Sequence, residues 1–123
     1  MLVSIIIRTL NEERYLDEIL VAIESQNVNN FSYEVVIVDS GSTDNTLKIA
    51  KSHNARITYI QKQDFTFGRS LNVGCDYAHG EYLVFISGHC IPANKDWLQS
   101  LIDPLIQKKC DYTYGRQIAR DTT

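Results

Sequence analysis

The sequence predicts an α/β fold, a three-layer α/β/α sandwich with a mostly parallel sheet at its centre. Short apolar runs rich in β-branched residues alternate along the chain with stretches in which apolar residues recur at helical spacing. The apolar runs lack the polar alternation of half-exposed strands, so each strand is expected to be buried on both faces. Strand, helix, strand order gives right-handed crossovers and parallel strand pairs.

The first strand–helix unit occupies the beginning of the chain. The apolar run LVSIIIR predicts a strand over residues 2–8. Asn11 is expected to cap a helix that extends to about Gln26. One face of that helix carries the spacing i, i+3, i+4, i+7, formed by Leu16, Ile19, Leu20 and Ile23.

The second unit begins with YEVVIVD, which predicts a strand over residues 33–39. Ser42 or Thr43 is expected to cap the helix that follows, because short hydroxyl side chains satisfy the first free N–H groups of a helix. Leu47 and Ile49 supply apolar residues to this helix.

The remaining elements repeat the same order. RITYIQ predicts a strand over residues 56–61 and EYLVFI another over 81–86, with a helix over about 69–78 between them. Pro104 is expected to kink or end a fourth helix, and DYTYGRQIA predicts a fifth strand over 111–119. The apolar face of the fourth helix consists of Trp97, Leu98, Leu101, Ile102 and Leu105. The predicted architecture is Rossmann-like.

Length and composition limit the class of protein. A chain of 123 residues suits a single domain over residues 1–123, and 44% hydrophobic with 22% charged residues is an ordinary globular balance. The net charge of −3 argues against nucleic acid as a partner. No apolar run is long enough to span a bilayer, and no export signal is visible. Three widely spaced cysteines argue against a disulfide framework and indicate a reducing, cytoplasmic location.

Polar side chains follow the predicted strands where ligands bind in this kind of sheet, outside the carboxyl ends of the strands. Thr9, Asn11 and Glu12 follow the first strand, Asp39 ends the second, and residues 87–89 follow the fourth. Asp39 has two interpretations that the spacing leaves open. It accepts hydrogen bonds from a ligand, or it holds the SGST loop that follows it.

The other candidates are weaker. Neither G-x-x-x-x-G-K-[ST] nor G-x-G-x-x-G occurs, so the SGSTD segment is not a standard phosphate loop, although a helix N-terminus after it favours an anion. Arg69 lies with Asn72 near the start of the third helix, where a phosphate contact and a solvated side chain are equally good explanations. His53 and His79 lie at predicted helix ends, where a cation is favourable.

Four segments, in order, resemble family 2 glycosyltransferases. They are VSIIIRTLNEERYLDEILVAIESQ, YEVVIVDSGSTDNT, FTFGRSLNVGCDYAHGEYLVFISGHCIP with the WL that follows, and YTYGRQIAR. The last is most similar to rhamnosyltransferase-like members, and together they cover nearly the whole chain. The resemblance implies a GT-A fold, a UDP- or dTDP-sugar donor and inverting transfer to a hydroxyl of a saccharide or lipid-linked acceptor. It places such a protein in polysaccharide or glycoconjugate synthesis, in the cytoplasm or at the inner face of the membrane.

The resemblance also assigns roles to residues. It implies that the nucleotide pocket is lined by Thr9, Asn11, Glu12 and Asp39. Asp39 is then expected to accept an N–H of uracil or thymine. The donor-binding candidates are Thr9, Asn11, Glu12, Asp39, Ser42, Arg69 and Asn72.

The sequence departs from the family pattern at the expected diphosphate site. The Asp-x-Asp motif that binds a divalent cation aligns with Ser87-Gly88-His89, and Leu71 stands where the family often has Arg. His89 is the remaining metal-ligating candidate, and a neutral imidazole suits Mn²⁺ better than Mg²⁺. A lone loop histidine is nevertheless more often a surface residue than a metal ligand.

No catalytic residue is assigned, because the family's catalytic base and acceptor half are expected beyond the fifth strand. The chain is therefore expected to be the donor-binding half of the domain. An alternative is a non-catalytic nucleotide-binding or interaction domain of the same fold. A phospho-acceptor signalling domain fits poorly, because Arg8 and Thr9 stand where such a domain has acids.

Overall fold

Four parallel strands form one sheet in the order β3-β2-β1-β4, which confirms the predicted α/β class. The computed structural model of the chain describes residues 1–64, 66–87, 92 and 94–106. The elements in chain order are β1 (Leu2–Thr9), α1 (Leu16–Glu24), β2 (Ser32–Asp39), α2 (Thr46–Ser52), β3 (Arg56–Tyr59), a short 3₁₀ helix η1 (Lys62–Asp64), α3 (Phe67–Tyr77), β4 (Tyr82–Ser87) and α4 (Trp97–Ile106).

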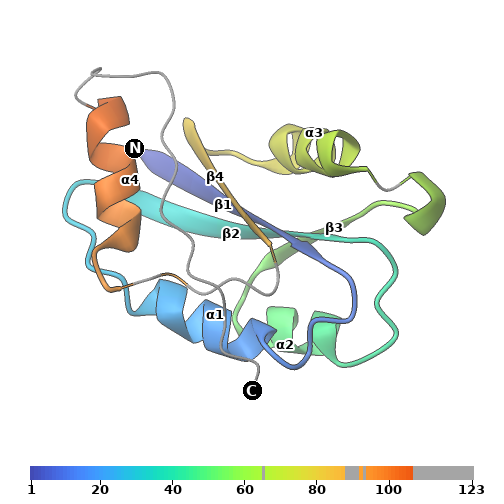
Figure 1. Ribbon diagram of the computed structural model, residues 1–123. Coiled ribbons are helices and arrows are strands. Elements are labelled where there is room, and N and C mark those ends of the chain that lie inside the picture. The colour runs from blue at the N-terminus through green and yellow to red at the C-terminus, as the bar shows by residue number, and fades with distance from the viewer. Residues whose placement is uncertain (65, 88–91, 93, 107–123) are drawn as a thin grey trace.

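Helices cover both faces of the sheet, as Figure 1 shows. The odd-numbered side chains of β1, such as Ile5 and Ile7, form the larger core with α1, α2 and α4. Ile6, on the opposite face, packs with Val36 and Val38 of β2 on the side of α3. Because successive side chains of a strand point to opposite faces, the unbroken apolar run of β1 supplies both cores.

The contact between α3 and the sheet depends on a glycine. A Cβ atom at Gly74 would lie 2.6 Å from Ile6 Cγ2 and 3.2 Å from Val38 Cγ2. The absence of a side chain at this position lets the helix backbone lie directly on β1 and β2.

Two predicted helix starts are wrong. The first helix begins at Leu16, and Asn11 lies four residues before its N-cap, Tyr15, with a left-handed φ of 53°. The second helix begins at Thr46, with Asn45 at the N-cap position, so neither Ser42 nor Thr43 caps it. In both cases the expected capping side chain bonds to a different part of the loops, as described below.

The third and fourth units agree closely with the prediction. The strand at 56–59 is shorter than expected, and α3 begins two residues earlier than expected, at Phe67. The last helix continues through Pro104 to Ile106, so the proline does not end it. The predicted fifth strand lies outside the described residues. Among the described residues, no helix is both long enough and apolar enough to cross a membrane.

Candidate functional site at the carboxyl edge of the sheet

The strand order fixes where a ligand crevice is expected. From β1 the chain proceeds outward through β2 and β3, and it then returns to the other side of β1 to form β4. Open α/β sheets bind ligands outside the carboxyl strand ends at such a reversal, which here lies between β1 and β4. The registers place Thr9 opposite Asp39 and Arg8 opposite Ser87, so these residues share that edge.

The Asp39 carboxylate is fully bonded within the protein. Its Oδ1 accepts from the hydroxyls of Thr9 at 2.7 Å and Ser42 at 2.6 Å. Its Oδ2 accepts from the backbone N–H groups of Gly41 at 3.0 Å and Ser42 at 2.8 Å. A carboxylate has about four acceptor positions, and only 1% of the residue is exposed. In this arrangement Asp39 holds the loop that follows β2.

The same four bonds set the charge of Asp39. Burial alone would raise the pKa of this carboxyl group, because it disfavours the ionised form. Hydrogen bonds from the side chain and N–H of Ser42, from Thr9 and from Gly41 outweigh burial and hold the pKa of Asp39 below its usual value. The group is therefore an anion at neutral pH.

Asn11 joins the loop after β1 to the loop after β2. Its N–H donates to Ser42 Oγ at 2.8 Å, and its Oδ1 accepts from the N–H groups of Thr43 at 2.8 Å and Asp44 at 3.4 Å. The left-handed backbone at Asn11 is a conformation that asparagine tolerates better than most residues. The Asn11 side chain was expected to accept hydrogen bonds from N–H groups at the start of the first helix. It accepts them instead from N–H groups of the loop after β2.

A second set of bonds ties the same loops together near the start of α2. Glu12 donates its N–H to Thr46 Oγ1 at 2.8 Å, and Glu13 Oε2 accepts from Asn45 N–H at 3.1 Å. Thr46 is fully buried, and both its N–H and its hydroxyl donate to Asp44 Oδ1. These hydrogen bonds outweigh burial and lower the pKa of Asp44. The two loops form one cross-linked unit.

Sequence reasoning missed Asp44 and Thr46 as organisers of this unit. The available signal was the Asp44-x-Thr46 spacing, because an aspartate commonly accepts a hydrogen bond from the backbone two residues on. Glu13 was expected only to favour the dipole of the first helix, whereas it bonds instead to the residue before α2.

Arg69 and Asn72 belong to α3, on the opposite face of the sheet from the Asp39 network. Arg69 is in the first turn, where its N–H donates to the capping Thr66 hydroxyl at 3.1 Å. Its Nη1 lies 3.8 Å from Asp64 Oδ1, and both side chains are mostly exposed. Asn72 is also exposed. The structure therefore brings together five of the seven donor-binding candidates. The other two, Arg69 and Asn72, lie on α3 at the opposite face of the sheet.

Arg8 is a further candidate that the sequence reasoning did not single out. It is the one charged residue of β1, it is half-buried, and its register partner is Ser87 at the end of β4. Strand alternation puts it on the same face as Ile6, which is the face that α3 covers. A charge inside an otherwise apolar strand was the signal that could have identified it.

A metal site is not formed by the described part of the chain. Within residues 1–64, 66–87, 92 and 94–106, no three His, Cys, Asp or Glu side chains are grouped so that they could hold a metal ion. His89 lies outside these residues, so its role as a ligand stays a prediction.

Comparison with known proteins identifies the family. The profile of glycosyl transferase family 2 matches residues 4–123. The poly(ribitol-phosphate) β-N-acetylglucosaminyltransferase TarS of Staphylococcus aureus strain Mu50 is 32% identical over 87 residues, which cover 68% of this chain and 15% of TarS. The chain thus spans less than a fifth of the length of this relative.

Solved structures agree with the sequence comparison. Residues 1–349 of S. aureus TarS in complex with UDP-GlcNAc superpose with a TM-score of 0.66 and 30% identity, covering 81% of this chain and 30% of that one. Glucosyl-3-phosphoglycerate synthase of Mycobacterium tuberculosis, crystallised with Mn²⁺ and UDP, gives a TM-score of 0.70 and 25% identity, covering 84% and 39% of the two chains. With the family profile matching nearly the whole length, this chain belongs to glycosyl transferase family 2.

Proposed function

We propose that the chain forms the donor-binding part of an inverting glycosyltransferase. It binds a nucleotide-diphospho-sugar whose sugar is transferred to an acceptor hydroxyl in polysaccharide or glycoconjugate synthesis. The observation that carries this proposal is the cross-linked polar rim at the carboxyl ends of β1 and β2, where Thr9, Asn11 and Asp39 meet, beside the strand-order reversal between β1 and β4. The complexes of TarS with UDP-GlcNAc and of the mycobacterial synthase with UDP support a nucleotide-sugar donor.

Recognition of the base is proposed to centre on Asp39. Its four acceptor positions are filled, so a ligand N–H must replace one of the four donors. Two of them are backbone groups, and Thr9 is only 1% exposed. The hydroxyl of Ser42, which is half-buried, can rotate away. The N3–H of uracil or thymine then takes its place on Oδ1.

Asn11 and Glu12 have a supporting role in this proposal. They hold the two loops at a fixed separation through the bonds from Thr43 N–H to Asn11 Oδ1 and from Glu12 N–H to Thr46 Oγ1, which do not involve the Ser42 hydroxyl. A rigid wall reduces the ordering that binding requires.

The diphosphate is proposed to lie between β1 and β4, within reach of cationic and amide side chains. The proposed phosphate contacts are Arg8 of β1 and, on α3, Arg69 and Asn72. Guanidinium groups suit phosphate oxygens because they present several N–H donors in one plane. In the family, a cation held by two carboxylates offsets the charge of the leaving diphosphate. Because both carboxylates are missing here, these side chains would supply part of that positive charge.

A divalent cation completes the proposed donor site, with Mn²⁺ favoured over Mg²⁺ and His89 as its ligand. The synthase structure with Mn²⁺ and UDP supports use of such an ion in this fold. Donor binding measured in Mn²⁺, Mg²⁺ and chelator tests the choice. Equal affinity in all three would remove the cation from the proposal.

Calorimetry with nucleoside diphosphates tests the site itself. UDP and dTDP are expected to bind, whereas CDP is a matched control because N3 of cytosine carries no hydrogen. Asp39→Asn should lower UDP affinity by about tenfold or more, the value of one hydrogen bond to a charged group. Equal binding of UDP and CDP, or unchanged affinity in Asp39→Asn, would contradict this mode of recognition. Binding with no transfer to any acceptor is expected both of the donor-binding part alone and of a non-catalytic domain of the same fold, so this outcome does not separate the two.

A further inference from the structure

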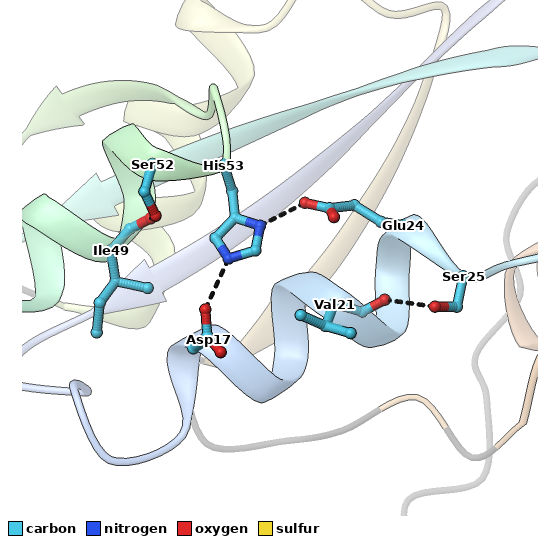
Figure 2. Close-up of polar contacts among 7 residues, drawn as sticks. All are labelled: Asp17, Val21, Glu24, Ser25, Ile49, Ser52 and His53. Carbon is cyan, nitrogen blue, oxygen red and sulfur yellow. Dashed lines mark hydrogen bonds and ion pairs between the residues drawn. The ribbon is translucent and has the colours of Figure 1, made fainter.

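His53 connects two helices through both of its ring nitrogens. It follows α2 directly, at the C-cap position, and its side chain is 14% exposed. Its Nδ1 lies 2.5 Å from Glu24 Oε1, and its Nε2 lies 2.7 Å from Asp17 Oδ1. Both carboxylates belong to α1, one near each end of that helix, as Figure 2 shows.

This geometry specifies the protonation state of the imidazole. An ionised carboxylate can only accept hydrogen bonds, so each ring nitrogen must carry a hydrogen, which makes His53 an imidazolium. A neutral ring has one N–H and one lone pair, and the lone pair would then face a carboxylate oxygen at hydrogen-bond distance. The hydrogen bonds to Asp17 and then Glu24 accordingly raise the pKa of His53, against the smaller effect of burial.

We propose that His53 is a protonation-dependent latch that fixes α2 against α1. When the ring is protonated, both ends of the bridge are closed. When it loses its proton, one of the two bonds is lost and a repulsive contact replaces it, so α2 is held less firmly.

The effect of His53 is expected to extend along α2 to the loop that precedes this helix. The helix α2 has seven residues and is therefore about 10 Å long. Thr46, at its other end, is bonded to Asp44 and Glu12 in the cross-linked loops. Loosening of the helix at His53 is therefore expected to loosen the loop at residues 40–46. The consequence for nucleotide binding rests on the proposed function, whereas the latch does not.

Other ionisable groups also lie close to His53. His53 and Glu24 line a pocket of about 270 Å³ together with Tyr33, Glu34 and Arg56. Arg56 is paired with Glu34, whose pKa is held low by hydrogen bonds that outweigh burial. Burial, and then Glu24, raise the pKa of Tyr33, which favours the neutral phenol.

The sign of the pH effect follows from linkage. A group whose pKa is raised by folding stabilises the protein fully below its unfolded pKa, about 6.5 for histidine. That stabilisation is lost as the pH rises through the higher, folded pKa. The latch is therefore expected to open as the pH rises through the raised, folded pKa of His53.

Urea unfolding of the 123-residue chain between pH 5.5 and 9 tests the latch. The unfolding midpoint of the natural sequence should fall over this range, and His53→Gln should lack that part of the fall, so that the two curves converge at high pH. His79→Gln is the matched control, because its exposed side chain follows α3, and it should track the natural sequence. Parallel curves for the natural sequence and His53→Gln would overturn the proposal.

A direct titration keeps the proposal testable if His53→Gln fails to fold. The ring of His53, followed by NMR, should titrate above the ordinary histidine midpoint in the natural sequence. Asp17→Asn and Glu24→Gln should each lower that midpoint. A midpoint that neither substitution moves would show that the bridge does not exist in solution.

Hydrogen exchange tests the reach of the latch without any nucleotide. Protection of the Ser42, Thr43 and Thr46 amides, corrected for intrinsic rates, should fall above the His53 midpoint in the natural sequence and stay constant with pH in His53→Gln. Protection that follows pH equally in both proteins would confine the latch to the α1–α2 contact. Failure of UDP to bind would bear on the proposed function alone.

Discussion

Asp39 and Ser42 are joined by two hydrogen bonds, because Ser42 donates its hydroxyl to Oδ1 at 2.6 Å and its backbone N–H to Oδ2 at 2.8 Å. Both oxygens of the carboxylate are therefore used within one turn of chain. The remaining position on each oxygen is taken by Thr9 and by Gly41. The sequence left open whether Asp39 binds a ligand or holds the loop that follows it. The two bonds to Ser42 show Asp39 holding that loop, so a ligand that binds Asp39 must first displace one of its present donors.

Replacement of the carboxylate should destabilise the fold as well as weaken binding. In Asp39→Asn the amide nitrogen faces two donors that it cannot accept from, and each unsatisfied buried donor costs about 1–3 kcal/mol. We expect a fall of at least about 2 kcal/mol in the free energy of unfolding, measured with urea at pH 7. Asp76→Asn, an exposed change on α3, should remain within about 0.5 kcal/mol of the natural sequence. If both variants are equally stable, the network around Asp39 contributes only to binding.

Acid should release the same network. The folded pKa of Asp39 lies below the ordinary aspartate value of 3.8, so its stabilising effect is complete above that ordinary value and is lost as the pH falls through the folded pKa. Between pH 5 and pH 2 the natural sequence should lose more free energy of unfolding than Asp39→Asn, as followed by urea midpoints. Glu34 and Asp44 titrate in the same direction in both proteins, so the difference isolates Asp39. A difference that persists unchanged to pH 2 would contradict the lowered pKa.

The helices and strands could be predicted because their signals are local. The apolar run of residues 2–8 and the helical spacing of Leu16, Ile19, Leu20 and Ile23 depend only on neighbouring residues. The predicted start of α1 was wrong because Asn11 accepts a hydrogen bond from Thr43, which is 32 residues away in the sequence. No local sequence pattern indicates a partner at that separation. Helix capping is a competition between near and distant donors, and here the distant donors win.

The candidate site was predicted in position and only partly in chemistry. Parallel strands bring Thr9 and Asp39 to one edge whatever their exact register, so their proximity followed from the fold class. Their direct hydrogen bond depends on the register, which the sequence does not show. His53 was likewise expected at a helix end, but its carboxylate partners are 29 and 36 residues away.

Arg56 should be difficult to replace by lysine. Its Nη1 donates to Glu34 Oε1 at 2.8 Å and to the backbone oxygen of Tyr77 at 3.1 Å, and its Cζ lies 4.3 Å from the centre of the Tyr77 ring. Lysine keeps the charge but not the planar group that makes these contacts together. We expect Arg56→Lys to lower the free energy of unfolding by about 1–2 kcal/mol in urea.

Arg69→Lys is the control for that change. Arg69 is 64% exposed, and its contact with Asp64 is long, so lysine should change stability by less than about 0.5 kcal/mol. Equal effects at the two positions would mean that the Glu34–Arg56–Tyr77 contacts contribute no more than an exposed ion pair.

Two glycines of α3 should respond in opposite directions to alanine. A Cβ at Gly74 would meet Ile6 and Val38, so Gly74→Ala must push the helix from the sheet and should cost about 1–3 kcal/mol. At Gly68 nothing lies within 4 Å of the added atom, so Gly68→Ala should stabilise the helix by about 0.5–1 kcal/mol. Thermal unfolding of the two variants shows directly whether each substitution raises or lowers the stability of the protein. Stabilisation by alanine at both positions would show that α3 packs less closely than the structure indicates.

Ser42→Ala separates exchange of a donor on Asp39 from direct contact with the ligand. Under the proposed exchange, the natural protein must break the Ser42–Asp39 hydroxyl bond before uracil can bond to Oδ1, whereas the alanine variant offers that position already open. A hydrogen bond of this kind is worth about 0.5–1.5 kcal/mol, so UDP should bind up to about tenfold more tightly to Ser42→Ala in calorimetry. The variant should also be less stable by a similar amount, because Asn11 N–H loses its acceptor. Ser52→Ala, at the other end of α2, removes a hydroxyl that donates to the Ile49 carbonyl of its own helix and should leave UDP affinity unchanged. Weaker binding by Ser42→Ala would mean that the hydroxyl contacts the nucleotide itself, and that the base N–H does not take its place on Asp39.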